Sequence, residues 1–559
     1  MSKLQRRPKF FRPVALAALL CWIGPLYAQT AVTLPPGAEP GREPLRPVLP
    51  TPGLSAPAVT VPQAPSADAP PGAQALRFRL AEYVIEGATA FGPAELQPLY
   101  AALLGTEISV ADAFGVAQAI ERRYREAGYV TSRVIVPQQT VEAGRFRVVV
   151  VEGFIADISY EGEIGQARAA VERLLTPLRA ARPVDVAEVE RRLLLANDLA
   201  GLTVRAALEP SPTAQGGSVL VVRSERRAVE PWLSLDNRMS PYLGSAQIAG
   251  GVAWNSFGSG ADRLSLSAKA SLPVKRSHSV GLNYDRLLSD NGSTLGLGVM
   301  QGRSRPGREL DALGVRSRVE GATVTVTHPF IRSREQNLRG MAQFELRNVD
   351  TEIAGTPFTA DRLRIGRVGL SFDRSDSWNG VTALRATVHK GFGRFGASAP
   401  GAALASRPDG QASFLKLTLD ATRVQQLTER ISLLASATAQ LSDDPLLASE
   451  EIGLGGGSFG RGYDDGEISA DSGAAASLEL RYALPAGVQF YGFIDGGRLR
   501  ANAAKPALER RTLSSAGFGV RASVAGVFAT LELAQPTSSD VRTQGDKRPR
   551  LFATVSHSF

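Results

Sequence analysis

The stretch LGGGSFGRGYDDG, residues 454–466, holds the residue types that could most readily do chemistry. The six residues that begin at Gly455 have the glycine spacing of a phosphate-binding P-loop. A P-loop continues with Lys and then Ser or Thr, but here the next residues are Arg461 and Gly462. No hydroxyl is placed to hold a metal ion, and an acidic, turn-rich segment follows instead of a helix. The pattern argues against nucleotide binding and leaves Arg461 and Tyr463 to be explained.

Other arrangements that could support catalysis or metal binding are missing from the sequence. The histidines are scattered without the spacing of a metal site; they are His278, His328, His389 and His557. No Gly-x-Ser-x-Gly segment supplies a nucleophilic serine, and the acidic pair Asp464–Asp465 has the character of loop charge. We therefore expect no catalytic residue, no metal and no cofactor, and predict that the protein is not an enzyme.

The N-terminus has the pattern of an export signal. Residues 6–12 include four basic side chains, and residues 14–23 form an apolar run too short to span a bilayer as a helix. Ala28 precedes a predicted cleavage site. We therefore predict a signal peptide at residues 1–28. The one cysteine, Cys21, lies within it, so no disulfide framework is expected. The net charge of +9 is scattered along the chain, which together with export argues against a nucleic-acid partner.

Residues 29–75 are rich in proline and alanine and nearly free of aromatic residues. This composition favours an extended chain with polyproline segments and no core of its own. We predict a periplasmic linker here. The sequence leaves open how the linker behaves and whether any N-terminal segment enters a pore.

Residues 76–152 and 153–228 repeat one order of elements: a strand, a short helix, a longer helix and two strands. In the first copy, Ser109 and Asp112 form a capping-box signal for the longer helix, and Gly128 is suited to follow its end. The second copy has an acidic cap and a terminal glycine at matching positions. The sequence therefore predicts two related α+β domains in tandem.

From about residue 229 the pattern changes to alternation of apolar and polar residues. In RLSLSAKASLP and SLELRYAL one face is small or aliphatic, and the other carries serine and charges of both signs. A soluble sandwich would also alternate, but charged residues along one face suit strands with lipid outside and water inside. The predicted fold class is a mainly β membrane protein, with a transmembrane β-barrel at residues 229–559 preceded by the two α+β domains.

The connections between these strands support a membrane barrel. After Gly473 the pattern gives five strands, joined alternately by tight turns and long polar loops, as in outer-membrane barrels. At roughly 20 residues for each strand and its connection, the region holds about sixteen strands. The last strand ends on Phe559, which we expect to serve as the C-terminal assembly signal.

Several segments resemble the transporters of two-partner secretion, the haemolysin secretion-activation family of POTRA-bearing outer-membrane barrels. The resemblance covers nearly all of the chain after the linker and is carried by YREAGYVTSRVIVPQQTVEAGRFRVVVVEG, NSFGSGADRLSLS, VTHPFIRSREQNL, FGRGY and GFIDGG. It implies that residues 76–152 and 153–228 are POTRA domains in the periplasm. It further implies an outer-membrane pore that moves an unfolded, exported partner protein to the cell surface.

The resemblance also implies a role for Arg461. In the family this motif lies on the sixth extracellular loop, which folds back into the barrel lumen, so residues 454–473 are expected to form that loop. The motif residues are Gly460, Arg461, Gly462 and Tyr463, and the implied partners on the barrel wall are Asp495 and, on the same face by period two, Phe493. Gly460 departs from the valine that is usual in the motif. From the residues alone, a solvated loop arginine remains the alternative.

The first POTRA domain is expected to contact the partner protein. The residues that the resemblance implies are Tyr124, Gly128, Tyr129, Arg133, Pro137, Gln138 and Gln139. Strand edges in both domains could also accept an extended segment by β-augmentation.

The expected partners are a large exported protein of the adhesin or cytolysin type, outer-membrane lipid, and the barrel-assembly machinery during biogenesis; we expect a monomer. Two rival functions are a barrel-inserting machine of the same superfamily, which usually carries more POTRA domains, and a passive porin, which has no use for a POTRA pair. Two POTRA domains favour secretion.

Overall fold

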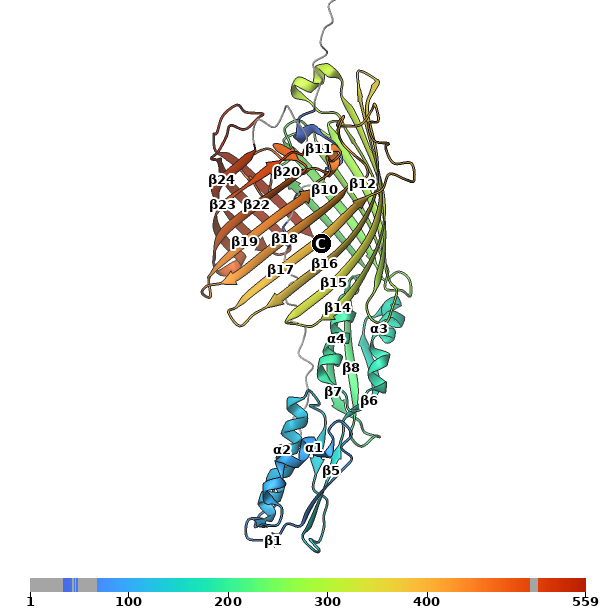
Figure 1. Ribbon diagram of the computed structural model, residues 1–559, viewed down its shortest axis with the longest axis vertical. Helices are drawn as coiled ribbons and strands as arrows, with labels where there is room; N and C mark the ends of the chain where they lie inside the picture. Colours follow the sequence, from blue (N-terminus) through green and yellow to red (C-terminus); the bar gives the residue numbers. More distant parts are fainter. Residues whose placement is uncertain (1–33, 43–44, 46, 49–67, 503–510) are drawn as a thin grey trace, which may run out of the picture. The chain divides into compact units, whose positions relative to one another are not determined.

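The computed structural model describes residues 34–42, 45, 47–48, 68–502 and 511–559. The predicted signal peptide, Cys21 and most of the Pro-rich segment lie outside these residues. Among the described residues, no helix combines the length and apolar character needed to cross a membrane. Figure 1 shows the elements in sequence colours.

The first α+β unit is built on a sheet of order β2-β5-β4, in which β2 runs parallel to the central strand β5. A separate pair, β1 with β3, lies outside this sheet. The elements are β1 (Arg77–Arg79), β2 (Glu82–Glu86), α1 (Pro93–Leu96), β3 (Glu107–Ser109), α2 (Val110–Glu126), β4 (Arg133–Ile135) and β5 (Arg145–Val151).

Helix α2 begins and ends at the residues that the sequence predicts. The Asp112 backbone N–H donates to the Ser109 hydroxyl at 3.1 Å, and the Ser109 N–H donates to the Asp112 carboxylate at 2.8 Å. Gly128 follows the helix with a φ of +92°, a conformation that favours glycine. The face between the two ends buries Ala117 and Ile120 in the core of the unit.

Two elements of the first unit differ from the expectation. The single strand expected across FRLAEYVIEG is divided into β1 and β2, because the chain turns Leu80 into the core and bonds its N–H to the carbonyl of Thr106. The helix expected over GPAELQPLYAALLG is only the short α1 followed by 3-10 turns. Pro98 has no N–H to donate and so interrupts an α-helical ladder there.

The second unit repeats this topology with a sheet of order β6-β8-β7, in which β6 and β8 are parallel. The Asp185 side chain caps α4 by accepting a hydrogen bond from the Ala187 N–H at 2.8 Å. The elements are β6 (Phe154–Gly162), α3 (Arg168–Leu175), α4 (Val186–Asn197), β7 (Leu202–Pro210) and β8 (Gly217–Arg226).

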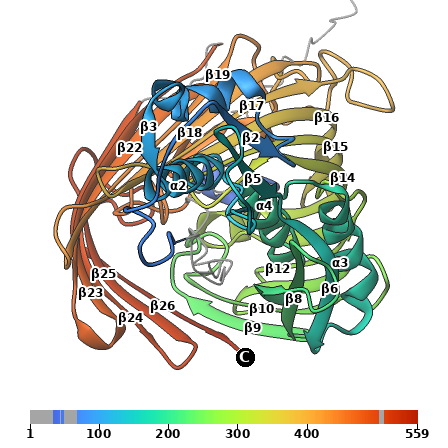
Figure 2. The same ribbon diagram turned by 90° about the horizontal axis from the view of Figure 1, so that it is seen from below.

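Sixteen strands among the described residues close into one antiparallel barrel, which confirms the predicted fold class and strand number. The first strand, β9, pairs with the last, β26, and Figure 2 shows them side by side in the ring. The strands are β9 (Val229–Asp236), β10 (Ala246–Asn255), β11 (Arg263–Leu272), β12 (Ser277–Leu287), β13 (Thr294–Ser304), β14 (Arg316–Arg332), β15 (Gln336–Ile353), β16 (Thr356–Ser375), β17 (Gly380–Gly391), β18 (Leu415–Gln426), β19 (Ile431–Ser442), β22 (Ser472–Ala483), β23 (Val488–Arg500), β24 (Thr512–Val524), β25 (Val527–Pro536) and β26 (Arg550–Ser558).

Alternation along each strand separates two faces of the wall. Val280, Leu282 and Leu266 are large, apolar and exposed, so they form the outer face that lipid covers. The intervening positions, such as Asn283 opposite Gly298, face the lumen. The wall therefore has an aliphatic exterior and a polar interior.

The connections fix which end of the barrel faces which compartment. Because β9 follows the second α+β unit directly, every connection after an odd strand of the barrel lies at the far end from the start of β9. The sixth such connection, between β19 and β22, is residues 443–471 and is called L6 below. The eighth, residues 537–549, is called L8.

The alternation leads to a prediction for the lipid face. Leu282→Arg places a charge near the middle of β12 on the outer face and should destabilise the barrel by about 2–4 kcal/mol. Asn283→Arg, one residue later on the lumen face, should be tolerated. Urea unfolding in lipid vesicles, followed by heat-modifiable gel mobility, measures both; equal losses of stability would contradict the assignment of faces.

Candidate functional site

The motif FGRGY lies on L6, which begins earlier than the lumen loop expected at 454–473. Within L6, β20 (Ile452–Leu454) pairs with β21 (Ile468–Ala470) as a short hairpin. The apolar side chains of L6 pack against lumen-facing wall residues and one residue of L8 in a buried cluster of Ile452, Leu454, Phe459, Tyr463, Ile468, Ala470, Ala475, Leu499, Leu513 and Val541. L6 is therefore a packed element inside the barrel.

Glycines let L6 fold tightly and approach the wall. Gly455 has a φ of +107°, and a Cβ there would lie 2.1 Å from the carbonyl oxygen of Asp464. A Cβ at Gly462 would lie 2.7 Å from the backbone nitrogen of Pro536 at the end of β25. Gly460, which stands where the family usually has valine, has a φ of +78°, at which a β-branched residue is strained. The departure from the motif thus fits this backbone.

Arg461 is buried, with 6% of its surface exposed. Its Nη1 donates to Glu479 Oε2 at 2.7 Å, and its Nη2 donates to the Ser477 hydroxyl at 2.9 Å. Nη1 also lies 3.4 Å from Glu532 Oε2. Nε is 3.3 Å from Asp495 Oδ2, an ion pair that lacks hydrogen-bond alignment. Arg461 is thus not the solvated loop residue that the sequence left as an alternative.

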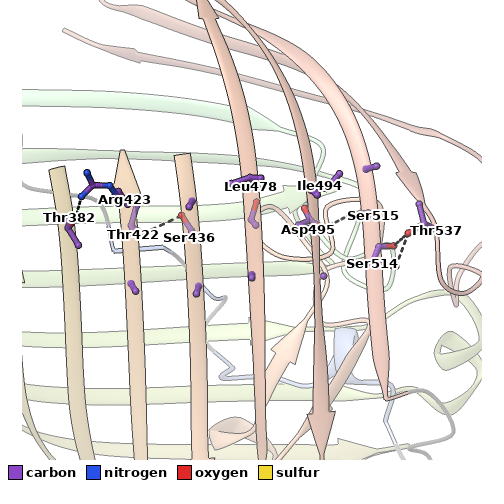
Figure 3. A pocket seen from close by; sticks show the side chains of 17 residues that line it. Thr382, Thr422, Arg423, Ser436, Leu478, Ile494, Asp495, Ser514, Ser515 and Thr537 are labelled. Atoms are coloured by element: carbon purple, nitrogen blue, oxygen red, sulfur yellow. Dashed lines mark hydrogen bonds between the residues drawn. The ribbon is translucent and has the colours of Figure 1, made fainter. Parts of the chain in front are cut away.

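Asp495, on β23, holds the backbone of the motif as well as its side chain. The Gly460 N–H donates to Asp495 Oδ1 at 2.9 Å, and the Ser515 hydroxyl on the neighbouring strand β24 donates to the same oxygen (Figure 3). The Phe493 ring, two residues earlier on β23, has its centre 4.1 Å from Arg461 Cζ, within cation–π range. The wall residues implied by the resemblance are therefore brought together around the motif.

Two carboxylates at this site were not singled out from the sequence. Glu479 on β22 makes the shortest contact to Arg461, and Glu532 on β25 completes the cluster while accepting a hydrogen bond from the Tyr491 hydroxyl at 2.8 Å. Arg481 and Arg521 on the wall share Glu479, and Arg238, in the connection after β9, shares Glu532. Four cations thus meet three anions, a balance of +1: Arg238, Arg461, Arg481 and Arg521 against Glu479, Asp495 and Glu532. The sequence signal that could have identified Glu479 is the alternation of Glu and Arg with leucine along β22, which places Glu479 on the lumen face.

Tyr463 ties the motif to L8. Its ring is buried, and its hydroxyl lies 2.9 Å from the Ser538 hydroxyl and accepts a hydrogen bond from the Ser539 N–H at 3.0 Å. The following residue, Asp464, forms an ion pair of 2.8 Å with Arg550 on β26. The motif is therefore bonded to the wall, to L8 and to the last strand.

The outer side of the same wall is shallow because its side chains are small. They leave an apolar depression of about 780 Å³ on the face that also presents Leu478 and Ile494 (Figure 3). The small residues are Ala421, Ala435, Ala437, Ala476, Gly496 and Ala516. Buried polar residues such as Ser477, Asp495 and Ser515 also border the depression, but their side chains are engaged on the lumen side.

The start of L6 is held by a second ionic cluster on a different part of the wall. Glu450 is 3% exposed and pairs with Lys416 Nζ at 2.7 Å and Arg347 Nη1 at 3.0 Å. Lys416 Nζ also donates to the Glu450 carbonyl at 2.9 Å. Arg367 approaches the same carboxylate to 3.7 Å. L6 is therefore anchored to β15, β16 and β18 as well as to β22, β23 and β25.

Part of the Pro-rich segment shares this anchor. Arg42 donates to the Ala448 carbonyl at 3.0 Å and lies 3.5 Å from Glu451, which also binds Arg407 at 2.8 Å. Arg347 donates to the Gly41 carbonyl at 3.3 Å. Ala448 and Glu451 lie on L6 and Arg347 lies on the lumen side of the wall, so residues around Arg42 are bonded within the barrel, whereas the sequence predicts a periplasmic linker at 29–75 and leaves open whether part of it enters the pore.

The seven POTRA residues implied by the resemblance do not form one surface. The Tyr124 side chain is fully buried and donates its hydroxyl to Glu152 at 2.8 Å, so it is a core residue. Burial, with this bond, raises the pKa of Tyr124. Partial burial opposes charge on Glu152, but hydrogen bonds from Thr89, Ala90 and Tyr124 outweigh it and lower the pKa of Glu152.

Most of the remaining residues of that set also have structural roles. Tyr129 is half-buried against Phe91, Gly128 follows α2, and Arg133 donates to the carbonyls of Val130 and Ser132. Half-buried Pro137 precedes Gln139, whose side chain donates to the Arg147 carbonyl at 2.7 Å and accepts from its N–H at 2.9 Å, as a neighbouring strand would. Of the seven, Gln138 alone is exposed.

Two family descriptions match the chain. Residues 216–522 match the family described as haemolysin secretion/activation protein ShlB/FhaC/HecB, and residues 78–153 match the POTRA domain of the ShlB type.

Two relatives of similar sequence are named as transporters. The heme/hemopexin transporter protein HuxB of Haemophilus influenzae is 22% identical over 80% of this chain and 81% of its own length. The outer membrane transporter CdiB of Escherichia coli is 24% identical over 84% of this chain and 82% of its own length. The solved structure of CdiB from Escherichia coli has a TM-score of 0.73 at 21% identity, covering 90% of this chain and 94% of that one.

The second cluster gives a prediction about L6. Glu450→Gln leaves Lys416, Arg347 and Arg367 without the carboxylate that all three share. Breaking a buried ion pair destabilises a structure by on the order of 3 kcal/mol, so L6 should loosen. A cysteine placed at Ser458 should then react at least about tenfold faster with a water-soluble maleimide. Glu429→Gln, an exposed acid in a turn, is the matched control. Equal labelling rates in all three proteins would show that the cluster does not hold L6.

Proposed function

Because this chain belongs to the haemolysin secretion/activation family ShlB/FhaC/HecB, we propose that it captures one exported partner protein and passes it unfolded through its barrel to the cell surface. The protein is an outer-membrane transporter of that family, with its POTRA domains in the periplasm. The partner is proposed to be a large exported protein of the adhesin or cytolysin type.

The observation that carries the proposal is the burial of Arg461 inside the barrel. An uncompensated buried guanidinium is costly, so the motif holds L6 against the wall as long as Glu479, Asp495 and Glu532 are in place. L6 occupies the lumen, so a translocating chain must pass beside it or move it. Ion pairs suit this task because water can replace them as the loop moves.

Capture of the partner is assigned to the POTRA domains. β7 is a nine-residue edge strand of the second sheet, and β2 is an edge of the first. The other edge of the second sheet, β6, has a register irregularity between Ile155 and Asp157, which disfavours pairing with another chain. An extended segment of the partner would add to β7 or β2 by main-chain hydrogen bonds.

Direction is proposed to come from the partner. Once outside, the partner folds and buries apolar surface, which opposes its return through the lumen. No nucleotide site is needed for this step, and the glycines of L6 serve loop packing instead of phosphate binding.

The barrel-insertion alternative is less well supported. The matches to the ShlB/FhaC/HecB family and to the ShlB type of POTRA domain favour secretion. We further propose that the chain acts as a monomer in outer-membrane lipid, and that Phe559, exposed at the end of the closing strand, is read by the barrel-assembly machinery during biogenesis.

Loss of the buried arginine should separate secretion from folding. Arg461→Ala should reduce release of the partner protein at least about tenfold, because L6 loses the guanidinium that bonds it to Glu479 and Ser477 on the wall. Heat-modifiable mobility should show a folded barrel. Arg385→Ala, a lumen arginine of β17 outside L6 contacts, is the control. Undiminished secretion by Arg461→Ala would reject the role of the motif.

Removal of the periplasmic units tests the capture step. Deletion of residues 83–222 should leave channel conductance in planar bilayers and abolish release of the partner protein. Conductance reports the barrel, and release reports capture. Continued release without the POTRA domains would contradict the proposed route.

A further inference from the structure

The outer face of β13 and β14 changes from aliphatic to charged over a few residues, with Glu320 paired to Arg318 at the boundary. Along β13 the outward positions run from Leu297 and Val299, both exposed, through Gln301 to Arg303. Arg303 lies opposite Arg318 on β14, whose outward face also continues from exposed valines to charged residues. This boundary marks the level at which lipid chains give way to headgroups.

The cationic end of these strands faces the cell exterior. β13 and β14 are joined at residues 305–315, a connection after the fifth strand of the barrel, and β11 and β12 are joined at 273–276 after the third. Both connections lie at the end opposite the periplasmic POTRA domains. The adjacent outer leaflet of this membrane consists of lipopolysaccharide, whose lipid A carries phosphate groups.

A small polar pocket lies between these two connections. Its volume is about 250 Å³, and its charged lining residues are Lys275, Arg276, Arg305, Asp311 and Arg316. Asp311 is bound by Arg276 through contacts of 2.5 and 2.8 Å, and this hydrogen bonding lowers the pKa of Asp311. The carboxylate is thus ionised and already engaged. Four cations against one anion leave +3.

Three of these cations lie outside the Arg276–Asp311 pair, although Lys275 acts on Asp311 electrostatically and Arg316 lies opposite Glu352 on β15. Lys275, Arg305 and Arg316 are exposed, and within the described part of the chain their side chains form no hydrogen bond or ion pair. Four cations that converge on one carboxylate repel one another more than that carboxylate can offset, so the arrangement favours an anionic ligand. Guanidinium groups bind phosphate oxygens through paired hydrogen bonds.

We propose that this pocket binds a phosphate group of a phosphorylated glycolipid in the outer leaflet. The acyl chains of that lipid would lie on the outward valines of β13 and β14, which are nearer the middle of the membrane. Two observations favour a lipid over a free anion. The strands that end at the pocket also form the lipid-covered face, and the charged residues near the pocket follow the apolar residues on the same outward face of those strands. Such a site would fix the depth and rotation of the β12–β14 wall in the membrane.

The test uses the full-length protein in detergent and counts retained lipid by native mass spectrometry. The probes are bisphosphorylated lipid A and the same lipid without phosphate. The rim variant is Lys275→Gln/Arg305→Gln/Arg316→Gln. The control, Arg286→Gln/Arg374→Gln/Arg430→Gln, removes the same charge from exposed positions at the periplasmic ends of strands. Heat-modifiable mobility checks that each barrel is folded.

The native protein and the control should retain phosphorylated lipid A at least about tenfold better than the dephosphorylated lipid, and the rim variant should lose this preference. Equal retention of both lipids by the native protein would overturn the proposal, and so would an unchanged preference in a folded rim variant. Displacement of the lipid by an equal concentration of inorganic phosphate would also overturn it, because the pocket would then recognise a free anion.

Discussion

The structure depends on neutralising the charge of one buried guanidinium, that of Arg461, inside the barrel. Arg461 has almost no access to solvent, so its charge must be met by the wall, and the wall meets it with carboxylates from three strands. These strands, β22, β23 and β25, can supply them only in one register, since a slip of one residue would turn each carboxylate towards lipid. Burial of the loop and closure of the barrel therefore specify each other.

L6 is braced at two places, and the two differ in character. Near its tip, a single arginine on the loop meets carboxylates on the wall; near its start, Glu450 on the loop meets cations on the wall. Because the loop charge is positive at one anchor and negative at the other, neither end of L6 can bind at the wall site of the other end. The residues around Arg42 join the second anchor, so they and L6 occupy the lumen together.

The sequence was sufficient for the architecture because strand alternation and helix caps are local signals. Ser109 and Asp112 predicted the start of α2, and alternation from residue 229 predicted a sixteen-stranded barrel. The positions of Arg461 and Asp495 came from a resemblance, since no local pattern joins residues on different strands.

Long-range contacts explain what the sequence did not predict. In the sequence, Glu479 and Glu532 resemble ordinary charged residues on a lumen-facing strand surface. Their proximity to one loop follows only from the pairing register of the closed barrel. Tyr124 carries a phenol that could serve a binding surface, but its hydroxyl is used by Glu152 in the core. The role of residues around Arg42 depends on contacts with L6, hundreds of positions away.

A double-mutant cycle between Arg461→Met and Glu479→Gln tests the central claim most directly. The parent protein, both single variants and the double variant would carry a cysteine at Ser458, and maleimide labelling across a urea series would give the free energy of L6 release. Direct pairing predicts a coupling energy of at least about 1.5 kcal/mol between the two substitutions. Losses that add to within about 0.5 kcal/mol would show that Arg461 and Glu479 act independently and would contradict the account.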